Sequence, residues 1–191
     1  MRSSPFTVIY DANVLYPAPL RDLLMHLALT GVYRARWSAL IHEEWKRNLL
    51  KNRQDITRKQ VDKTSQLMDQ AIPDALVSNY EPLIEGLELP DKDDRHVLAA
   101  AIKCNASAII TFNLKDFPTS VLEPLDIEPI HPDSFIADLW DLDKAAVIKA
   151  AHDHRSSLKN PPYSVDGYLN RLLNQGLPES VNYLSEFSML I

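Results

Sequence analysis

The chain has 191 residues, of which 46% are hydrophobic and 24% are charged, a composition that excludes a disordered protein. Acidic residues outnumber basic ones by 26 to 20, and the formal net charge of −6 excludes bulk electrostatic attraction as the driving force for binding nucleic acids or anionic membranes. A single cysteine, Cys104, excludes an internal disulfide and a cysteine-rich zinc site. The first residues do not resemble a secretory signal and no apolar run approaches the ~20 residues that span a bilayer, so we expect a cytoplasmic protein without a membrane span.

The first half of the chain is predicted to alternate short apolar strands with amphipathic helices. The run TVIY is β-branched and aromatic, which is typical of a buried parallel strand. Leucines then recur at a helical spacing, and Gly31 is predicted to end that helix, while Ser38 is a suitable N-cap for the next one. In chain order the predicted elements are a strand at 7–10, a helix at 20–28, a strand at 32–37, a helix at 38–50 and a polar helix at 56–72.

The second half is predicted to complete the sheet and to end in helices. The segment DKDDRHVLAAAIKC opens with acids and continues with strong helix formers, and SAIIT after it is another short buried strand. A polar loop, FNLKDFP, follows that strand. The predicted elements are a short helix after Pro73, a strand at 87–89, a helix at 91–104, strands at 107–111 and 125–130, and helices near 135–140, at 145–158, at 164–175 and after Pro178.

This order of elements predicts an α/β fold, a three-layer domain with a mainly parallel sheet flanked by helices. The sheet is expected to be complete by about residue 131, which gives a domain of residues 1–131 and a helical C-terminal extension of residues 132–191. The extension carries apolar stripes that must be buried. They could pack on the domain, form a dimer contact or receive a helix of a partner protein, and the sequence does not choose among these.

Polar side chains follow two of the predicted strands at the point where each strand ends. Asp11 and Asn13 follow the first strand, and Asn113 and Asp116 follow the SAIIT strand. Parallel sheets place reactive groups at the carboxyl ends of their strands. If the two strands are neighbours, these four oxygen-bearing side chains converge on one edge of the sheet.

Two predicted helices can each add a carboxylate to this edge. Glu44 borders the apolar stripe of its helix, and Asp94 lies at the start of its helix on the buried side. Asp94 could instead be a simple helix N-cap. Glu43 is turned by about 100° from Glu44, in line with Lys46 and Arg47, where a solvated salt bridge is the better expectation.

A cluster of carboxylates points to a divalent cation. The negative charges repel, so one pKa would be raised unless a cation is present, and Mg²⁺ or Mn²⁺ prefers carboxylate oxygens and water. A bound metal can orient and deprotonate water and neutralise charge on a phosphate, which suits phosphodiester hydrolysis. We therefore expect Asp11 and Asp94 to hold the metal, Glu44 and Asp116 to complete the catalytic cluster, and Asn113 to orient substrate or water.

A basic stretch from Lys46 to Lys63 begins beside Glu44 and holds only two acids. One interpretation is a track for an RNA backbone, with Lys46 and Arg47 as the substrate-binding residues nearest the acids. The alternatives are an ordinary solvated helix face or a surface that receives an acidic segment of a partner.

Three segments of the chain together resemble a known family. VIYDANVLYPAPLRDLL, SALIHEEWKRNL and DDRHVLAAAIKCNASAIITFNLKDF have the order and spacing of the PIN-domain family, and the resemblance is greatest to the VapC-type ribonuclease toxins of bacterial toxin–antitoxin pairs. It extends over roughly residues 6–130 and implies a metal-dependent endoribonuclease whose acids fall on Asp11, Glu44, Asp94 and Asp116. Many relatives have an acid where this chain has Asn113, which leaves a second metal ion open.

The resemblance also implies RNA as substrate, Mg²⁺ or Mn²⁺ as cofactor and a cognate antitoxin as protein partner, with a homodimer as a further possibility for the extension. The alternative function is a non-catalytic, PIN-derived module that binds RNA or protein, which the neutral Asn113 permits. A phospho-acceptor protein that uses Asp11 is disfavoured, because A-N-V follows it and the second acid of a D-x-D motif is missing.

Overall fold

The computed structural model describes residues 6–191. Residues 1–5 lie outside the described residues. They belong to the predicted first domain and to the N-terminal segment that does not resemble a secretory signal. The chain forms two compact units: one holds the residues up to Tyr16 together with Tyr33–His131, and the other holds Pro17–Val32 and Pro132–Ile191. The division into domains at residue 131 stays a prediction, and the structure adds that residues 17–32 group with the C-terminal residues.

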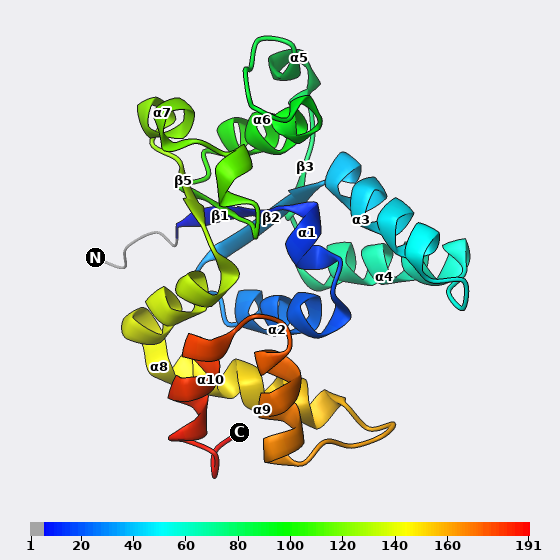
Figure 1. The fold of residues 1–191 in the computed structure, drawn as a ribbon, viewed down its shortest axis with the longest axis vertical. Coiled ribbons are helices and arrows are strands. Elements are labelled where there is room, and N and C mark those ends of the chain that lie inside the picture. The colour runs from blue at the N-terminus through cyan, green and yellow to red at the C-terminus, as the bar shows by residue number, and fades with distance from the viewer. Residues whose placement is uncertain (1–5) are drawn as a thin grey trace. The chain divides into compact units, whose positions relative to one another are not determined.

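The first unit is built on a parallel sheet of five strands with the order β3-β2-β1-β4-β5 (Figure 1). The helix α6 packs on three of the strands, and α4 lies on the other side of the sheet (Figure 1). The predicted α/β fold with a parallel sheet flanked by helices is therefore confirmed. The strands are β1 Thr7–Tyr10, β2 Arg34–Ser38, β3 Leu76–Val77, β4 Ala108–Ile110 and β5 Glu128–Ile130.

Helices connect these strands in the way that a parallel sheet requires. The longer ones begin at side-chain caps: Ser38 Oγ accepts a hydrogen bond from Ile41 N at 3.2 Å, and Thr57 forms a reciprocal capping box with Gln60. The helices of this unit are α1 Ala12–Leu15, α3 Ala39–Asn52, α4 Arg58–Ala71, α5 Glu81–Ile84, α6 Arg95–Lys103 and α7 Thr119–Leu122, with the 3₁₀ turns η1 Lys92–Asp94, η2 Leu114–Asp116 and η3 Glu123–Leu125.

The edge strand β3 is where the sequence prediction was wrong. Residues 87–89, predicted as a strand, are irregular, and β3 pairs with β2 through Trp37↔Leu76 and Ser38↔Val77 instead. The short helix predicted after Pro73 is present as α5, but β3 lies between the proline and this helix. A strand of two residues is too short to show the alternation of apolar and polar residues from which a strand is predicted.

The second unit consists of four helices. Its longest helix, α8, contains the two helices predicted near 135–140 and at 145–158, which are separated by a kink at Asp143. Asp143 is not helical, and its side chain accepts a hydrogen bond from Ala146 N at 3.0 Å. Asp133 at the start of α8 caps α10, because its carboxylate accepts from the backbone N–H groups of Glu179 and Ser180, both at 2.9 Å. The helices are α2 Ala18–Ala28, α8 Pro132–Ser157, α9 Val165–Leu173 and α10 Pro178–Ser185.

Among residues 6–191, no helix combines the length and the apolar character needed to cross a membrane.

The buried His154 makes the stability of the second unit dependent on pH. Its side chain stacks on His26 and lies 3.0 Å from Tyr168 Oη, and burial lowers its pKa to about 4, with the positive charges of His26 and Arg171 adding to the effect. A histidine in the unfolded chain has a pKa of about 6.5. Its contribution to stability is therefore present above pH ~6.5 and lost as the pH falls from ~6.5 towards 4.

We expect the free energy of unfolding to drop by about 2 kcal/mol between pH 7.5 and pH 5 on account of His154. Urea denaturation of the wild type and of His154→Gln at both pH values measures this, and the drop should be smaller in the variant. His152→Gln is the matched control, because His152 is exposed on the same helix. An identical pH dependence in the wild type and His154→Gln would contradict the prediction.

Candidate active site

Asp11 lies at the junction of β1 and α1, at the carboxyl edge of the sheet. Its side chain is buried, with 2% of the residue exposed, and caps α1 by accepting a hydrogen bond from Ala12 N at 2.6 Å. The other carboxylate oxygen accepts hydrogen bonds from Asn13 Nδ2 at 2.6 Å and from Thr111 Oγ1 at 2.7 Å. These hydrogen bonds hold the carboxylate of Asp11 in one position at the edge of the sheet.

Asn13 and Thr111 join the ends of β1 and β4, which pair in the register Tyr10↔Ile110. Asn13 Nδ2 donates to Thr111 Oγ1 at 2.9 Å, and Asn13 Oδ1 accepts from Phe112 N at 3.1 Å. Thr111 Oγ1 also accepts from Asn113 N at 3.0 Å. The sequence predicted Asn13 at this edge but not a role for Thr111. The residue could have been found, because Thr111 carries a hydroxyl at the end of the predicted strand SAIIT, two residues before Asn113.

Glu44 projects from α3 and is held by a histidine from α6. Glu44 Oε2 lies 3.1 Å from His96 Nε2, so the ring donates through this nitrogen, and both side chains are largely buried. The other ring nitrogen, Nδ1, is buried without a hydrogen-bond partner within the described part of the chain. His96 therefore orients the carboxylate of Glu44.

Asp94 ends η1 immediately before α6, and its side chain makes no capping hydrogen bond. Asp91 caps η1, because its side chain accepts from Asp93 N at 2.9 Å. Asp94 stands at the N-cap position of α6, as the alternative expected, but without the side-chain hydrogen bond of a cap. Its carboxylate is therefore available to other groups.

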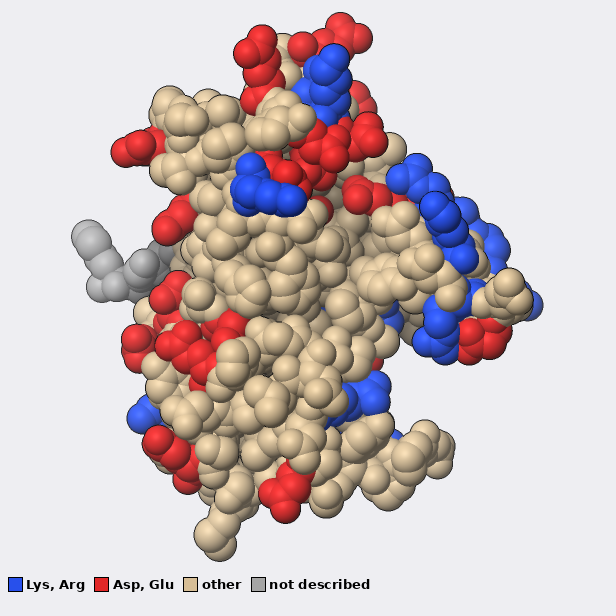
Figure 2. Space-filling view, viewed as in Figure 1, with Lys and Arg blue, Asp and Glu red and all other residues tan. Residues whose placement is uncertain are grey.

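The pKa values show that the predicted acids influence one another electrostatically. Burial, together with the charges of Asp11, Asp91, Glu44 and Asp116, raises the pKa of Asp94 to about 7. The pKa of Asp11 is raised to about 6, mainly by burial and also by the charge of Glu44, although the hydrogen bond from Thr111 acts to lower it. The structure thus brings the four predicted acids within electrostatic reach, and Figure 2 shows acidic side chains gathered over the region between α6 and α3.

Two cavities adjoin the acids, and Glu44 and Asn113 line both of them. The first, called here the acidic cavity, has a volume of about 390 Å³, and the second, the amide cavity, about 310 Å³. The acidic cavity is lined by Leu40, Glu43, Glu44, Arg47, Asp91, Asp93, Asp94, His96 and Asn113. The amide cavity is lined by Ala12, Asn13, Tyr16, Glu44, Asn48, Asn52 and Asn113.

The donor set fits a hard divalent cation bound through few protein ligands. Carboxylate oxygens dominate the acidic cavity, and the pKa values of Asp11 and Asp94 are raised first by burial and then by neighbouring negative charge, which a cation would neutralise. Within residues 6–191 no three acids, histidines or cysteines are arranged as a ready-made metal cluster. Mg²⁺ commonly binds through one or two carboxylates and keeps several waters, so these observations are compatible.

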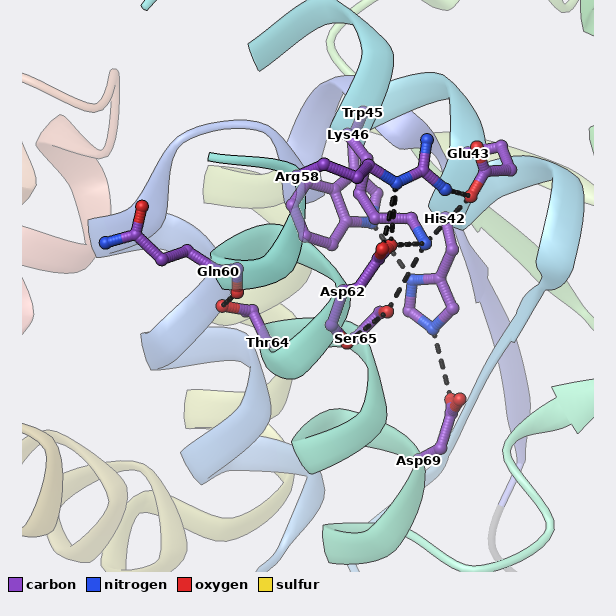
Figure 3. Close-up of polar contacts among 10 residues, drawn as sticks. All are labelled: His42, Glu43, Trp45, Lys46, Arg58, Gln60, Asp62, Thr64, Ser65 and Asp69. Atoms are coloured by element: carbon purple, nitrogen blue, oxygen red, sulfur yellow. Dashed lines mark hydrogen bonds and ion pairs between the residues drawn. The ribbon is translucent and has the colours of Figure 1, made fainter. Parts of the chain in front are cut away.

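The structure separates the two predicted substrate-binding cations. Lys46 is buried, with 7% exposed, and its ammonium binds Glu43 at 2.8 Å and Asp62 of α4 at 2.9 Å (Figure 3). The salt bridge expected for Glu43 is therefore present and is made with Lys46, but its lysine end is buried and not solvated. Arg58 joins the same network, whereas Arg47 is exposed and lines the acidic cavity. Lys46 thus links α3 to α4, and only Arg47 faces the acids.

An α/β unit with a parallel sheet and carboxylates gathered at the carboxyl edge of its strands is the architecture that the sequence predicted for a PIN-like protein. The family model described as a PIN domain matches residues 7–115, and the chain belongs to the PIN-domain family. A second family model, described as the VapC50 C-terminal domain, matches residues 132–186. The predicted resemblance to this family is confirmed.

One relative is similar to this chain over about half of its length. It is a protein of Mycobacterium tuberculosis named "Putative ribonuclease VapC50", which is 37% identical over 101 residues. The match covers 53% of this chain and 59% of the relative. Comparison with solved structures finds no match.

In metal-free protein, Asp94→Asn is expected to raise stability at alkaline pH. The pKa of Asp94 is about 7 in the folded protein and ~3.9 in the unfolded chain. The ionised carboxylate therefore lowers the stability of the fold when the pH is above both values, and the group has no effect on stability when the pH is below both. After allowance for solvent screening of a half-buried group, we expect a gain of about 1–2 kcal/mol at pH 8 that disappears at pH 4. Denaturant titrations with EDTA measure it.

Glu85→Gln is the control for this experiment, because Glu85 is an exposed acid that does not line the acidic cavity. A loss of stability in Asp94→Asn at pH 8 would show that the carboxylate is favourably paired in the folded state.

Proposed function

We propose that the chain is a metal-dependent endoribonuclease that acts in the cytoplasm as the toxin of a type II toxin–antitoxin system. Membership of the PIN-domain family and the name of the M. tuberculosis relative support a nuclease. The observation that carries the proposal is the gathering of the carboxylates, because burial and the charges of the neighbouring acids together raise the pKa of Asp94 to about 7. Without a bound cation, the repulsion among these carboxylates lowers the stability of the folded protein.

The proposed roles follow from the position of each side chain. Asp11, fixed by its hydrogen bonds to Thr111 and Asn13, and Asp94, free of a capping role, would hold Mg²⁺ or Mn²⁺. Glu44 and Asp116 would complete the acidic cluster. The metal, when bound, would activate water and neutralise charge on the phosphate.

The substrate would approach from the two cavities. Asn113 lines both, so its amide is placed to orient the RNA, and Arg47 is the cation of the acidic cavity that can bind a backbone phosphate. Figure 2 shows further Lys and Arg side chains gathered over α3 and α4. An antitoxin is the proposed protein partner, because toxins of this type are inhibited by one, and a homodimer is a further possibility.

Cleavage of RNA tests the proposal directly. In single-turnover assays with Mg²⁺ or Mn²⁺, Asp11→Asn and Asp94→Asn are expected to lower the rate by about 100-fold or more, and EDTA should abolish cleavage by the wild type. Glu85→Gln should retain the wild-type rate. Circular dichroism should confirm that every variant is folded.

Equal, EDTA-insensitive rates in wild type and Asp11→Asn would refute a catalytic role for the acids. Mn²⁺ titration calorimetry gives a separate readout, because the wild type should bind Mn²⁺ more tightly than Asp11→Asn. A wild type that neither cleaves RNA nor takes up Mn²⁺ would favour the non-catalytic binding module.

Arg47 and Lys46 are neighbours with different expected effects. Arg47→Ala should weaken RNA binding and lower the salt dependence by about one charge, with unfolding free energy changed by less than about 0.5 kcal/mol. Lys46→Met should lower stability by about 1–2 kcal/mol, because it removes the buried cation between Glu43 and Asp62 and leaves them with only the exposed Arg58, and it should leave the salt dependence of RNA binding unchanged. Fluorescence anisotropy at several salt concentrations and urea denaturation measure the two effects, and a reversal of the pattern would contradict this assignment.

A further inference from the structure

The amide cavity differs in chemistry from the acidic cavity beside it. Of its seven lining residues, four are asparagines and one is a tyrosine, and Glu44 is the one charged residue. Neither lysine nor arginine lines it. A phosphate therefore has no cation to bind there, and the surroundings favour a neutral, flat group with several hydrogen-bond donors and acceptors.

The side chains on α3 that line this cavity form one stripe. Glu44, Asn48 and Asn52 are spaced four residues apart, so they lie on the same face of the helix. The stripe begins at the carboxylate proposed for catalysis and continues into exposed amides. An RNA that lies along this stripe with its reacting phosphate near Glu44 places the adjoining part of the nucleotide against the amides.

Most of these polar groups are available to a ligand. Asn13 is fully used in joining β1 to β4, but the side-chain amides of Asn48 and Asn113 have no hydrogen-bond partner among residues 6–191. Asn52 Nδ2 donates to Tyr16 Oη at 3.2 Å, which leaves the carbonyl of Asn52 and the hydroxyl proton of Tyr16 free. Carboxamides can pair with the edge of a nucleobase through two hydrogen bonds, and aromatic side chains support unstacked bases.

We propose that the amide cavity binds the base of an unpaired nucleotide next to the scissile phosphate of RNA. This inference rests on the proposed nuclease function of the adjoining site. Its volume of about 310 Å³ lies at the lower end of ligand pockets, near 300 Å³, which suits one base rather than several. Asn48 and Asn52 then select the base, while the acids cut irrespective of sequence.

Binding of short RNA to the full-length protein tests the inference without depending on catalysis. The probes are four homopolymeric RNA hexamers and an abasic hexamer of the same length, followed by fluorescence anisotropy in EDTA. The wild type is expected to bind at least one base-bearing hexamer about tenfold more tightly than the abasic one, since a good bidentate pair contributes about 1–3 kcal/mol. The double variant Asn48→Ala/Asn52→Ala should bind all five probes alike.

Two control variants separate base recognition from general binding. Gln66→Ala removes an exposed amide of α4 that does not line the cavity, and it should keep the wild-type preference. Arg47→Ala should weaken binding of all five probes by the same factor, because a phosphate contact is insensitive to the base.

The inference is overturned if the wild type binds the abasic hexamer as tightly as the others, if it binds none of the probes, or if the double variant keeps the preference. Cleavage assays distinguish this failure from that of the proposed function. A protein that prefers one base but never cleaves RNA would refute the nuclease and retain the base-binding site, whereas cleavage without any preference would do the reverse.

Discussion

The hydrogen bonds among Asp11, Asn13 and Thr111 are the interaction on which the organisation of the first unit depends. They join two neighbouring strands at the edge where the chain turns into α1 and η2. A buried carboxylate is costly unless polar groups surround it, and here an amide, a hydroxyl and a backbone N–H do so. The same bonds keep the carboxylate in one position beside Glu44 and Asp94, so structural cohesion and the proposed chemistry share one set of contacts.

The helix α3 divides its side chains between two tasks. One face carries Lys46 and His42, which bind Asp62 and Asp69 of α4 and thereby attach α4 to the unit (Figure 3). Another face carries Glu44, which His96 orients from α6. The charged side chains that hold α3 against α4 are therefore different from those that line the cavities. Of the neighbouring cations Lys46 and Arg47, Arg47 is the one that lines the acidic cavity.

Much of this architecture was predictable from the sequence because it depends on local patterns. The strands β1 and β4 end in polar residues after short apolar runs, and Ser38 marks the start of α3, so the edge of the sheet and its acids could be placed in advance. The strand β3 could not be, because two residues carry no periodicity. The burial of Lys46 was missed for a different reason: it depends on α4 folding back onto α3, which is a tertiary contact that a basic stretch does not reveal.

The arrangement of α3 has a consequence for how relatives of this protein diverge. Asn48 and Asn52 are exposed, and within the described residues their side chains make one hydrogen bond, from Asn52 to Tyr16, whereas the opposite face of the helix forms ion pairs with α4. Exchanges at the two asparagines are therefore expected to leave the free energy of unfolding nearly unchanged while they alter the polar lining of the amide cavity. The chemistry of this cavity can in this way change among relatives while the acids beside it and the ion pairs that hold α3 stay the same.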